Sequence, residues 1–161
     1  EDVPCREAKQ FGGWICSASL IRWRNIMSCC DGPAVVISGN KRWKEVNANA
    51  EIFLRGSDFA GIVFDYHGLN NFCAVGIGHG KLTVYRKFFG KKEVLYTQEA
   101  PDLNNVAYTA AISRKGNTLN VKMGDFADFA LDMPFAAGGA AGVVVENGSI
   151  ILNSLNMTGT M

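Results

Sequence analysis

The stretch AGIVFDYHGLNNFCAVGIGHGKLTVYRKFFGKKEVLY, residues Ala60–Tyr96, decides the fold class of this chain. Its apolar residues alternate with polar or small ones, which is the period of a β-strand that buries one face. Turn-forming segments interrupt the alternation at residues 68–71, 79–80 and 90–92. The stretch therefore predicts successive antiparallel strands joined by tight connections.

Strand signals continue on both sides of this stretch and predict about a dozen strands in all. The pair Asn147-Gly148 predicts a type I′ hairpin turn between two of them. A helix over residues 127–137 is an alternative for one segment, but Pro134 and the glycine pair that follows it oppose a helix. The further strands are expected over residues 14–19, 20–26, 34–38, 43–54, 107–113, 118–123, 140–146 and 149–157.

The composition is that of a folded protein. Apolar residues make up 48% of the 161 residues and charged residues 19%, which excludes disorder. The formal net charge is +1, and no basic run exceeds the Lys91-Lys92 pair. We therefore expect neither a nucleic-acid partner nor an anionic membrane held by bulk charge. No apolar stretch approaches about 20 residues, so no insertion into a membrane is expected.

The cysteines indicate a compartment. No C-x-x-C pair occurs, which disfavours a zinc site. One or two disulfides that tie the N-terminal segment to the sheets are expected instead, which implies an oxidising compartment. Cys29 and Cys30 are adjacent and are expected to reach separate partners. Because the count of five is odd, one thiol is free or pairs outside this chain. The disulfide candidates are Cys5, Cys16, Cys29, Cys30 and Cys73.

Three segments resemble the concanavalin A-like lectin/glucanase superfamily, especially its laminin-G-like and keto-disaccharide-hydrolase-like branches. They are the stretch quoted above, YTAAISRKGNTLNVKM (Tyr108–Met123) and AGGAAGVVVENGSIILNSLNM (Ala137–Met157). In those domains an a-G-i-v-f strand precedes n-y-y-x-v-x-i and g-k-l-x-v-x-r strands, a y-x-l-x-v … G-n-x-l-x-v hairpin and a G-x-x-G-l strand. The resemblance implies an all-β fold, namely a two-sheet antiparallel β-sandwich or jelly roll.

The length fits one domain, and no Pro/Ser-rich spacer, low-complexity tract or long repeat divides the strands. One domain is expected over residues 1–161, with cysteine-containing N-terminal strands over 1–40 and the best-matching core over 41–158. No cofactor and no metal site are expected. Calcium is common in laminin-G-like domains, but the sequence has no D-x-D-type ligand string, so calcium stays unassigned.

The carboxylates lack the pattern of a glucanase. Retaining glucanases of this superfamily carry E-x-D-x-x-E or E-x-D-x-E on one strand, where the period of two places the acids on one face. Glu45 and Glu51 have no acid between them, and Asp125, Asp128 and Asp132 have a helical spacing. We therefore expect no enzyme and no catalytic residue. A sugar-active hydrolase with an unfamiliar site is the alternative.

The sheet face opposite the core is the expected ligand-binding surface. Alternation sends Tyr66 to the core face and Asp65 to the opposite face. Tyr85 is the expected ring for stacking on a sugar, and Ala74 and Gly76 are expected to keep a groove open beside it. The alternative is an ordinary half-solvated sheet face. The candidate ligand-binding residues on this face are Asp65, His67, Thr83, Tyr85 and Lys87. The loop over residues 66–72 adds the candidates Asn70, Asn71 and Phe72, and its alternative is a turn in which Gly68 and Asn70 set the backbone angles.

The hairpin RKFFGKK, residues Arg86–Lys92, carries two adjacent phenylalanines among basic residues. Because neighbouring strand residues point to opposite faces, one of Phe88 and Phe89 must point away from the core. These two residues are the candidate contacts for a protein partner. The alternative is a lysine-guarded edge hairpin.

The sequence therefore predicts a non-catalytic recognition or adhesion module of a secreted or cell-surface protein. Its partner is expected to be a glycan or an extracellular protein. A purely structural domain of a larger extracellular protein is a further alternative.

Overall fold

The computed structural model describes residues 9–11, 14–16, 19–21 and 26–161, with side chains described from Pro33 onward. Within these residues the regular elements are all β-strands, which confirms the all-β prediction and makes residues 127–132 a strand rather than a helix. None of the described residues forms a helix long and apolar enough to cross a membrane. The strands are β1 Lys9–Phe11, β2 Trp14–Cys16, β3 Ser19–Ile21, β4 Ile26–Ser38, β5 Glu45–Arg55, β6 Phe59–Gly68, β7 Asn71–Gly78, β8 Lys81–Phe88, β9 Lys91–Glu99, β10 Ala107–Lys115, β11 Thr118–Met123, β12 Ala127–Asp132 and β13 Ala140–Thr160.

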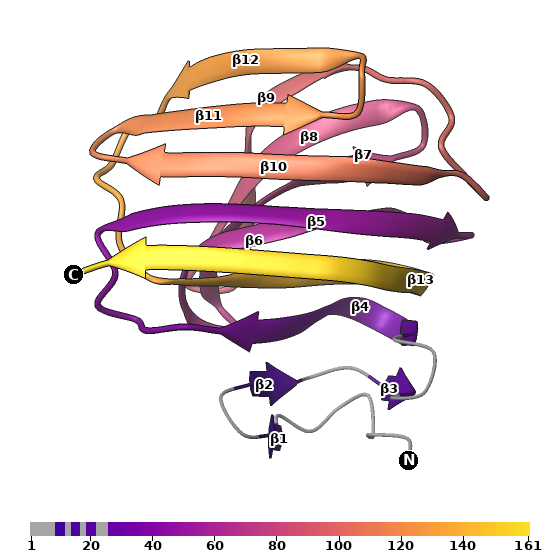
Figure 1. Cartoon of the computed structure of the whole chain (residues 1–161), viewed down its shortest axis with the longest axis horizontal. Coiled ribbons are helices and arrows are strands. Elements are labelled where there is room, and N and C mark those ends of the chain that lie inside the picture. The colour runs from indigo at the N-terminus through magenta and orange to yellow at the C-terminus, as the bar shows by residue number, and fades with distance from the viewer. Residues whose placement is uncertain (1–8, 12–13, 17–18, 22–25) are drawn as a thin grey trace.

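The strands form an antiparallel sheet that curls into two layers (Figure 1). The hydrogen-bonded order is β12-β11-β10-β5-β13-β6-β7-β8-β9. In Figure 1, β12, β11, β10 and β5 lie in the nearer layer, and β6 to β9 lie behind them. This is the expected face-to-face arrangement of two antiparallel sheets, in which each layer buries the apolar face of the other. The outer strands meet through the rings of Tyr96 and Phe129, whose centroids are 4.6 Å apart.

Strand β13 joins the two layers and corrects one prediction. Its residues up to Glu146 pair with β6, and its residues from Ser149 onward pair with β5. The predicted strands over 140–146 and 149–157 therefore exist, but they pair with different layers and not with each other as a hairpin. The register against β4 shifts between Glu146 and Gly148, and Asn147 has a φ of 46°. A left-handed backbone favours Asn-Gly in a hairpin turn. Here Asn147 has this conformation at the irregularity where β13 passes from one layer to the other.

The main core lies between the layers and follows the period of two. In β11, for example, buried Leu119, Val121 and Met123 alternate with exposed residues. The Tyr108 hydroxyl on β10 donates a hydrogen bond of 2.9 Å to the Ala60 carbonyl on β6, which links the layers across the core. The two layers therefore bury each other's apolar faces, as the alternation predicts.

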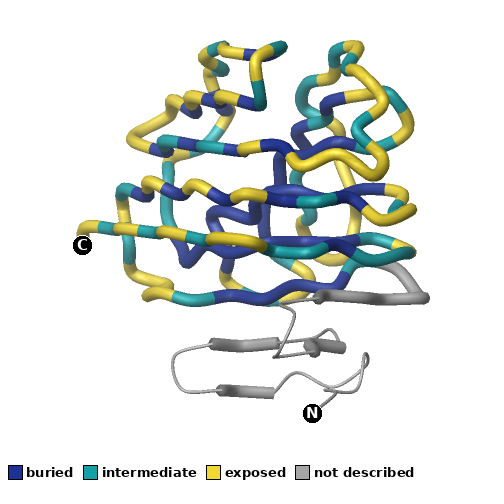
Figure 2. Tube along the Cα trace, turned by 45° about the vertical axis from the view of Figure 1, so that its right-hand side comes forward, coloured by how far each residue is buried: buried dark blue, intermediate teal, exposed yellow. Residues whose placement is uncertain are grey.

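A second apolar cluster covers the other face of the rear layer. Strands β6 and β7 are buried along most of their length on both faces, and Figure 2 shows dark tube in the middle of the molecule. The sheet is therefore not the half-solvated face that an antiparallel sheet can present. The cluster consists of Val35, Ile37, Phe59, Val63, Tyr66, Phe72, Ala74, Tyr85, Ala140 and Val144.

One cysteine has a described side chain. Cys73 lies in the core of β7 and carries a free thiol, so it does not take the disulfide role for which the sequence made it a candidate. Burial raises the pKa of this thiol to about 12. The other candidates, Cys5, Cys16, Cys29 and Cys30, lie outside the residues whose side chains the structure describes.

Candidate functional site

The outer face of β6, β7 and β8 is where the sequence predicts an open groove, and the structure fills it. Tyr85 and Phe72 are each 1% exposed. Their ring centroids lie 6.1 Å apart, and the ring of Phe59 lies 5.3 Å from that of Tyr85. The prediction that Tyr85 presents its ring to a sugar is therefore wrong, and the same burial corrects Phe72.

Phe59 is the physical reason for the closure. A Cβ on Gly76 would come within 2.7 Å of Phe59 Cζ, so the missing side chain at Gly76 makes room for this ring rather than for a ligand. The ammonium of Lys92 lies over the Tyr85 ring, 4.3 Å from its centroid. The Tyr85 hydroxyl donates a hydrogen bond of 3.1 Å to Glu146 Oε1. Burial, and then the neighbouring Glu146 carboxylate, raise the pKa of Tyr85.

A bulge in β6 turns Asp65 away from this face. The register against β13 shifts by one residue between Val63 and Tyr66, and Asp65 has a φ of 50°. Strict alternation ends at this bulge, because the extra residue changes which face the next side chain meets. Tyr66 therefore joins the outer cluster and Asp65 turns inward, the reverse of the prediction.

Asp65 is a structural residue. It forms a buried ion pair with Arg114 of β10, with Arg114 Nε 2.9 Å from Asp65 Oδ2. The backbone N–H of Gly138 donates to the other carboxylate oxygen at 3.1 Å. Burial raises the pKa of Asp65, and the Arg114 guanidinium opposes this rise. A side chain that is 6% exposed and fully engaged is not available to a glycan, so its predicted binding role is wrong.

The remaining predicted residues lie apart from one another. His67 and Asn70 are exposed near the β6–β7 turn, and Asn71 begins β7. Thr83 and Lys87 are half-buried on β8. The structure does not gather them into one pocket, and their part in binding stays a prediction.

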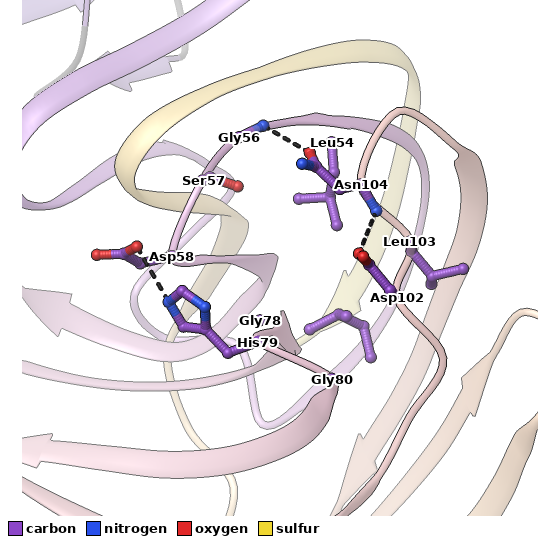
Figure 3. Close-up of a pocket in the computed structure, with 11 residues that line it drawn as sticks. Leu54, Gly56, Ser57, Asp58, Gly78, His79, Gly80, Asp102, Leu103 and Asn104 are labelled. Atoms are coloured by element: carbon purple, nitrogen blue, oxygen red, sulfur yellow. Dashed lines mark hydrogen bonds and ion pairs between the residues drawn. The ribbon is translucent and has the colours of Figure 1, made fainter.

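A pocket of about 470 Å³ lies at the other end of the sandwich (Figure 3). It is formed by residues 56–58 between β5 and β6, the His79-Gly80 turn, and residues 102–104 between β9 and β10. These connections meet because β5, β7 and β9 all end at the same side of the molecule (Figure 1). Such a volume suits a small ligand. The pocket is lined by Leu54, Gly56, Ser57, Asp58, Ile77, Gly78, His79, Gly80, Asp102, Leu103 and Asn104.

Hydrogen bonds fix one wall of the pocket. Asn104 Oδ1 accepts from the Gly56 backbone N–H at 2.7 Å, and the Asn104 backbone N–H donates to Asp102 Oδ1 at 3.0 Å. The next residue, Asn105, donates its N–H to the Leu54 carbonyl at 2.9 Å. The long β9–β10 connection is thus held against the end of β5. The amide group of Asn104 is oriented before any ligand arrives.

The opposite wall carries an aspartate–histidine pair. His79 Nε2 lies 3.0 Å from Asp58 Oδ1, and Asn147 Nδ2 donates to Asp58 Oδ2 at 3.0 Å. The hydrogen bond from Asn147 and the neighbouring His79 hold the pKa of Asp58 below its usual value, although burial opposes them. Asp58 is therefore a carboxylate at neutral pH. Figure 3 shows this pair on the side of the pocket opposite Asn104 and Asp102.

The pocket offers both kinds of contact that a sugar uses. Its apolar part comes from Leu54, Ile77 and Leu103, which can contact the C–H face of a ring. The polar part includes the Asp102 carboxylate, an acceptor, and the Asn104 amide, a donor through Nδ2. Ser57 Oγ is buried and has no hydrogen-bond partner within the described part of the chain. Among the described residues, no phenylalanine, tyrosine or tryptophan lines this pocket.

The sequence reasoning missed all the polar residues of this pocket. A signal was present, because Gly56-Ser-Asp58 and Asp102-Leu-Asn-Asn105 are clusters of turn-forming polar residues between strands. Loops on a rigid β scaffold often carry binding residues. The sequence alone does not show which connections lie at the same end of the sandwich, because that depends on the strand order.

The described residues show no cluster of three or more histidine, cysteine, aspartate or glutamate side chains that could hold a metal ion. The acids that the sequence considered for catalysis also lie apart from the pocket. Glu45, for instance, is 3.2 Å from Lys115 Nζ on the exposed side of β5.

Comparisons with known proteins concern the fold. No family model and no curated protein matches the sequence. Among solved structures, the carbohydrate-binding module CBM66 from Bacillus subtilis superposes with a TM-score of 0.80 at 13% identity, covering 91% of this chain and 96% of that module. The exoplasmic/lumenal domain of VIP36, solved with Ca²⁺ and Man3GlcNAc, gives 0.65 at 11% identity, covering 94% of this chain and 86% of that domain. The GH43 protein BlXynB from Bacillus licheniformis gives 0.67 at 12% identity and covers 96% of this chain, which spans 38% of that enzyme.

These superpositions show similarity of the overall fold. They extend over more than nine-tenths of the chain, although identity is low. The resemblance that the sequence indicated is confirmed at the level of fold: the chain has the concanavalin A-like β-sandwich architecture.

Proposed function

We propose that this chain is a non-catalytic carbohydrate-recognition module that holds a sugar unit in the pocket between the β5–β6, β7–β8 and β9–β10 connections. The observation that supports it most is the fixed wall of Asn104 and Asp102 beside an apolar floor. A sugar needs donors and acceptors for its hydroxyls and an apolar surface for its C–H groups. Here the donor and acceptor are preorganised, which lowers the entropic cost of binding.

The fold adds support. Proteins of this architecture include the carbohydrate-binding module CBM66 and VIP36, the latter solved with Man3GlcNAc bound. Fold alone does not determine function, so the argument rests on the pocket. The proposed setting is a secreted or cell-surface protein, in which a glycan or an extracellular protein is the partner.

A hydrolase of the same architecture is the alternative, because BlXynB, a GH43 protein, also superposes. Glycoside hydrolysis generally needs one carboxylic acid whose pKa is raised so that it can protonate the leaving group. Asp58 has the opposite environment, since Asn147 and His79 lower its pKa. This favours binding without catalysis.

The test is a glycan array followed by titration of each hit. Asn104→Asp keeps an oxygen that can accept from the Gly56 N–H but removes the amide donor. We expect it to weaken glycan binding roughly tenfold, the effect of about one net hydrogen bond. Asn120→Asp makes the same change on the exposed side of β11, far from the pocket, and should leave binding unchanged.

Two results would overturn the proposal. One is an array without any glycan hit. The other is equal affinity of Asn104→Asp and Asn120→Asp for the hits. Hydrolysis of a bound oligosaccharide would overturn the non-catalytic part and favour the alternative.

A further inference from the structure

Three apolar side chains are exposed on two neighbouring turns at the end of the sandwich opposite the pocket. Phe89 is 83% exposed, Leu69 41% and Phe88 40%. The two turns are joined by a hydrogen bond of 3.2 Å from the Gly90 N–H to the Asn70 carbonyl. Leu69, Phe88 and Phe89 therefore form one surface feature, which we call the apolar tip.

Packing contacts hold the phenylalanine rings of the apolar tip in place. The rings of Phe88 and Phe89 pack edge to face with centroids 4.4 Å apart. The guanidinium of Arg86 lies 4.1 Å from the Phe88 centroid and 4.3 Å from that of Phe135. A phenylalanine stacked on an arginine is held in a defined position, so the tip presents a formed surface.

Turn chemistry does not explain why residue 89 is a phenylalanine, and the contact of its ring with Phe88 leaves the residue 83% exposed. Phe89 has a φ of 49° and Gly90 a φ of 76°, so both central positions of the turn are left-handed. Asn, Asp and Gly suit such positions, whereas a bulky side chain is strained there. The ring gains little from burial in return. Strain that the fold does not require is often found where a residue makes contact with a partner.

Two lysines, Lys87 and Lys91, flank the apolar tip. Lys91 is exposed beside Phe89, and Lys87 is half-buried on β8. No ion pair of Lys87 or Lys91 occurs within the part of the chain that the structure describes. Lys92 is not part of this rim, because its ammonium lies over the Tyr85 ring and 3.8 Å from Glu146. The tip is therefore an apolar apex with a basic rim, although the net charge of the whole chain is only +1.

We propose that the apolar tip docks on the surface of an anionic lipid bilayer. Phe88, Phe89 and Leu69 would enter the interface between headgroups and acyl chains, while the lysines would meet the anionic headgroups. The sequence led us to expect no membrane partner because the total charge is small. The proposal rests instead on the local arrangement that the fold creates.

The size of the tip favours a membrane over a protein. A fully buried aromatic side chain contributes about 150–250 Å², so three partly covered side chains offer well under the roughly 800 Å² per partner of a stable protein interface. A bilayer requires no matching surface, because its interface accepts a few apolar side chains flanked by basic residues.

The test is co-sedimentation of the whole chain with vesicles of phosphatidylcholine mixed with phosphatidylserine, and with vesicles of phosphatidylcholine alone. We expect binding to the mixed vesicles that weakens as salt is raised, and weaker binding to the neutral ones. Phe89→Asn should reduce binding at least about tenfold, because it removes the most exposed apolar ring. Asparagine suits the left-handed turn position, so this variant keeps the hairpin.

Val106→Asn is the matched control. Val106 is 45% exposed in the β9–β10 connection, at the end of the molecule away from the tip, and its replacement should leave binding unchanged. Lys91→Gln should weaken binding to the mixed vesicles and not to the neutral ones. The proposal is overturned if the chain does not sediment with anionic vesicles, a result that would favour a protein partner for the tip. It is also overturned if Phe89→Asn and Val106→Asn bind the mixed vesicles equally well.

Discussion

Arg114 on β10 and Asp65 on β6 form an ion pair of 2.9 Å in the interior, and this pair links the two layers of the sandwich. Arg114 is 0% exposed. Its other nitrogens donate to the backbone carbonyls of Gly116, at 3.1 Å, and Phe135, at 2.8 Å. The pair therefore holds the β10–β11 turn and the segment before β13 as well as the two layers. A buried charge pair is costly to break because the remaining partner is left without compensation.

We expect Arg114→Met to destabilise the protein by about 3–5 kcal/mol, since it leaves the Asp65 carboxylate buried and unpaired. Urea unfolding followed by tryptophan fluorescence measures this change. Asp65→Asn combined with Arg114→Met removes both charges and should restore part of the lost stability. Lys115→Met is the control, because Lys115 and Glu45 form an exposed pair worth less than about 1 kcal/mol. A loss below that value for Arg114→Met would contradict the assignment.

The two aspartates, Asp58 and Asp65, should titrate in a fixed order. Burial raises the pKa of Asp65, whereas Asn147 and His79 lower that of Asp58. Carboxyl ¹³C NMR should therefore show Asp58 losing its proton at the lower pH. The two aspartates make the free energy of unfolding depend on pH in opposite directions. The contribution of Asp58 is present above its unfolded-state pKa and is lost as the pH falls through its folded-state pKa. At Asp65 the folded protein holds the proton more tightly than the unfolded chain, so acidification through the folded-state pKa favours folding. The reverse order of titration would show that one of these environments is wrong.

The period of two was sufficient to predict the layers but not the faces near a bulge. The alternation over residues 118–123 predicted a strand, and β11 is a regular strand in which apolar residues are buried at every second position. In β6 one extra residue between Val63 and Tyr66, relative to β13, exchanges the faces of Asp65 and Tyr66. A single extra residue is not visible in the hydrophobic pattern, since the pattern on either side of it is still a strand pattern.

The closed outer face escaped prediction for a related reason. In the sequence, a tyrosine that faces small residues on the neighbouring strand predicts an open groove on that face of the sheet. Whether a ring from the next strand fills the space depends on register, and here Phe59 lies over Gly76. The pocket is similar, because its polar residues come from three connections that only the strand order brings together. What could be predicted was local, and what could not be predicted depends on pairing between distant segments.

The thiol of Cys73 should be unreactive in the folded protein. It is 2% exposed and its pKa is raised to about 12, so almost no thiolate is present at neutral or mildly alkaline pH. We expect iodoacetamide at mildly alkaline pH to leave Cys73 unmodified, and the same treatment in denaturant to alkylate it fully. Peptide mass spectrometry distinguishes this site from the other cysteines. Modification of Cys73 at equal rates in both conditions would place it outside the core.

Gly76 should be intolerant of even one added carbon. A Cβ at this position would contact the Ala60 carbonyl and the Phe59 ring, and the carbonyl belongs to the sheet backbone and cannot move freely. We expect Gly76→Ala to cost about 1–3 kcal/mol, the usual effect of overpacking. Gly68→Ala is the matched substitution, because no atom lies within 4 Å of the added carbon there. It should be neutral or stabilise by up to about 1 kcal/mol, since alanine restricts the unfolded chain. Urea unfolding of both variants gives the comparison. If Gly76→Ala were as stable as Gly68→Ala, Phe59 would not be packed over Gly76, and the outer face of the rear layer would be open to a ligand.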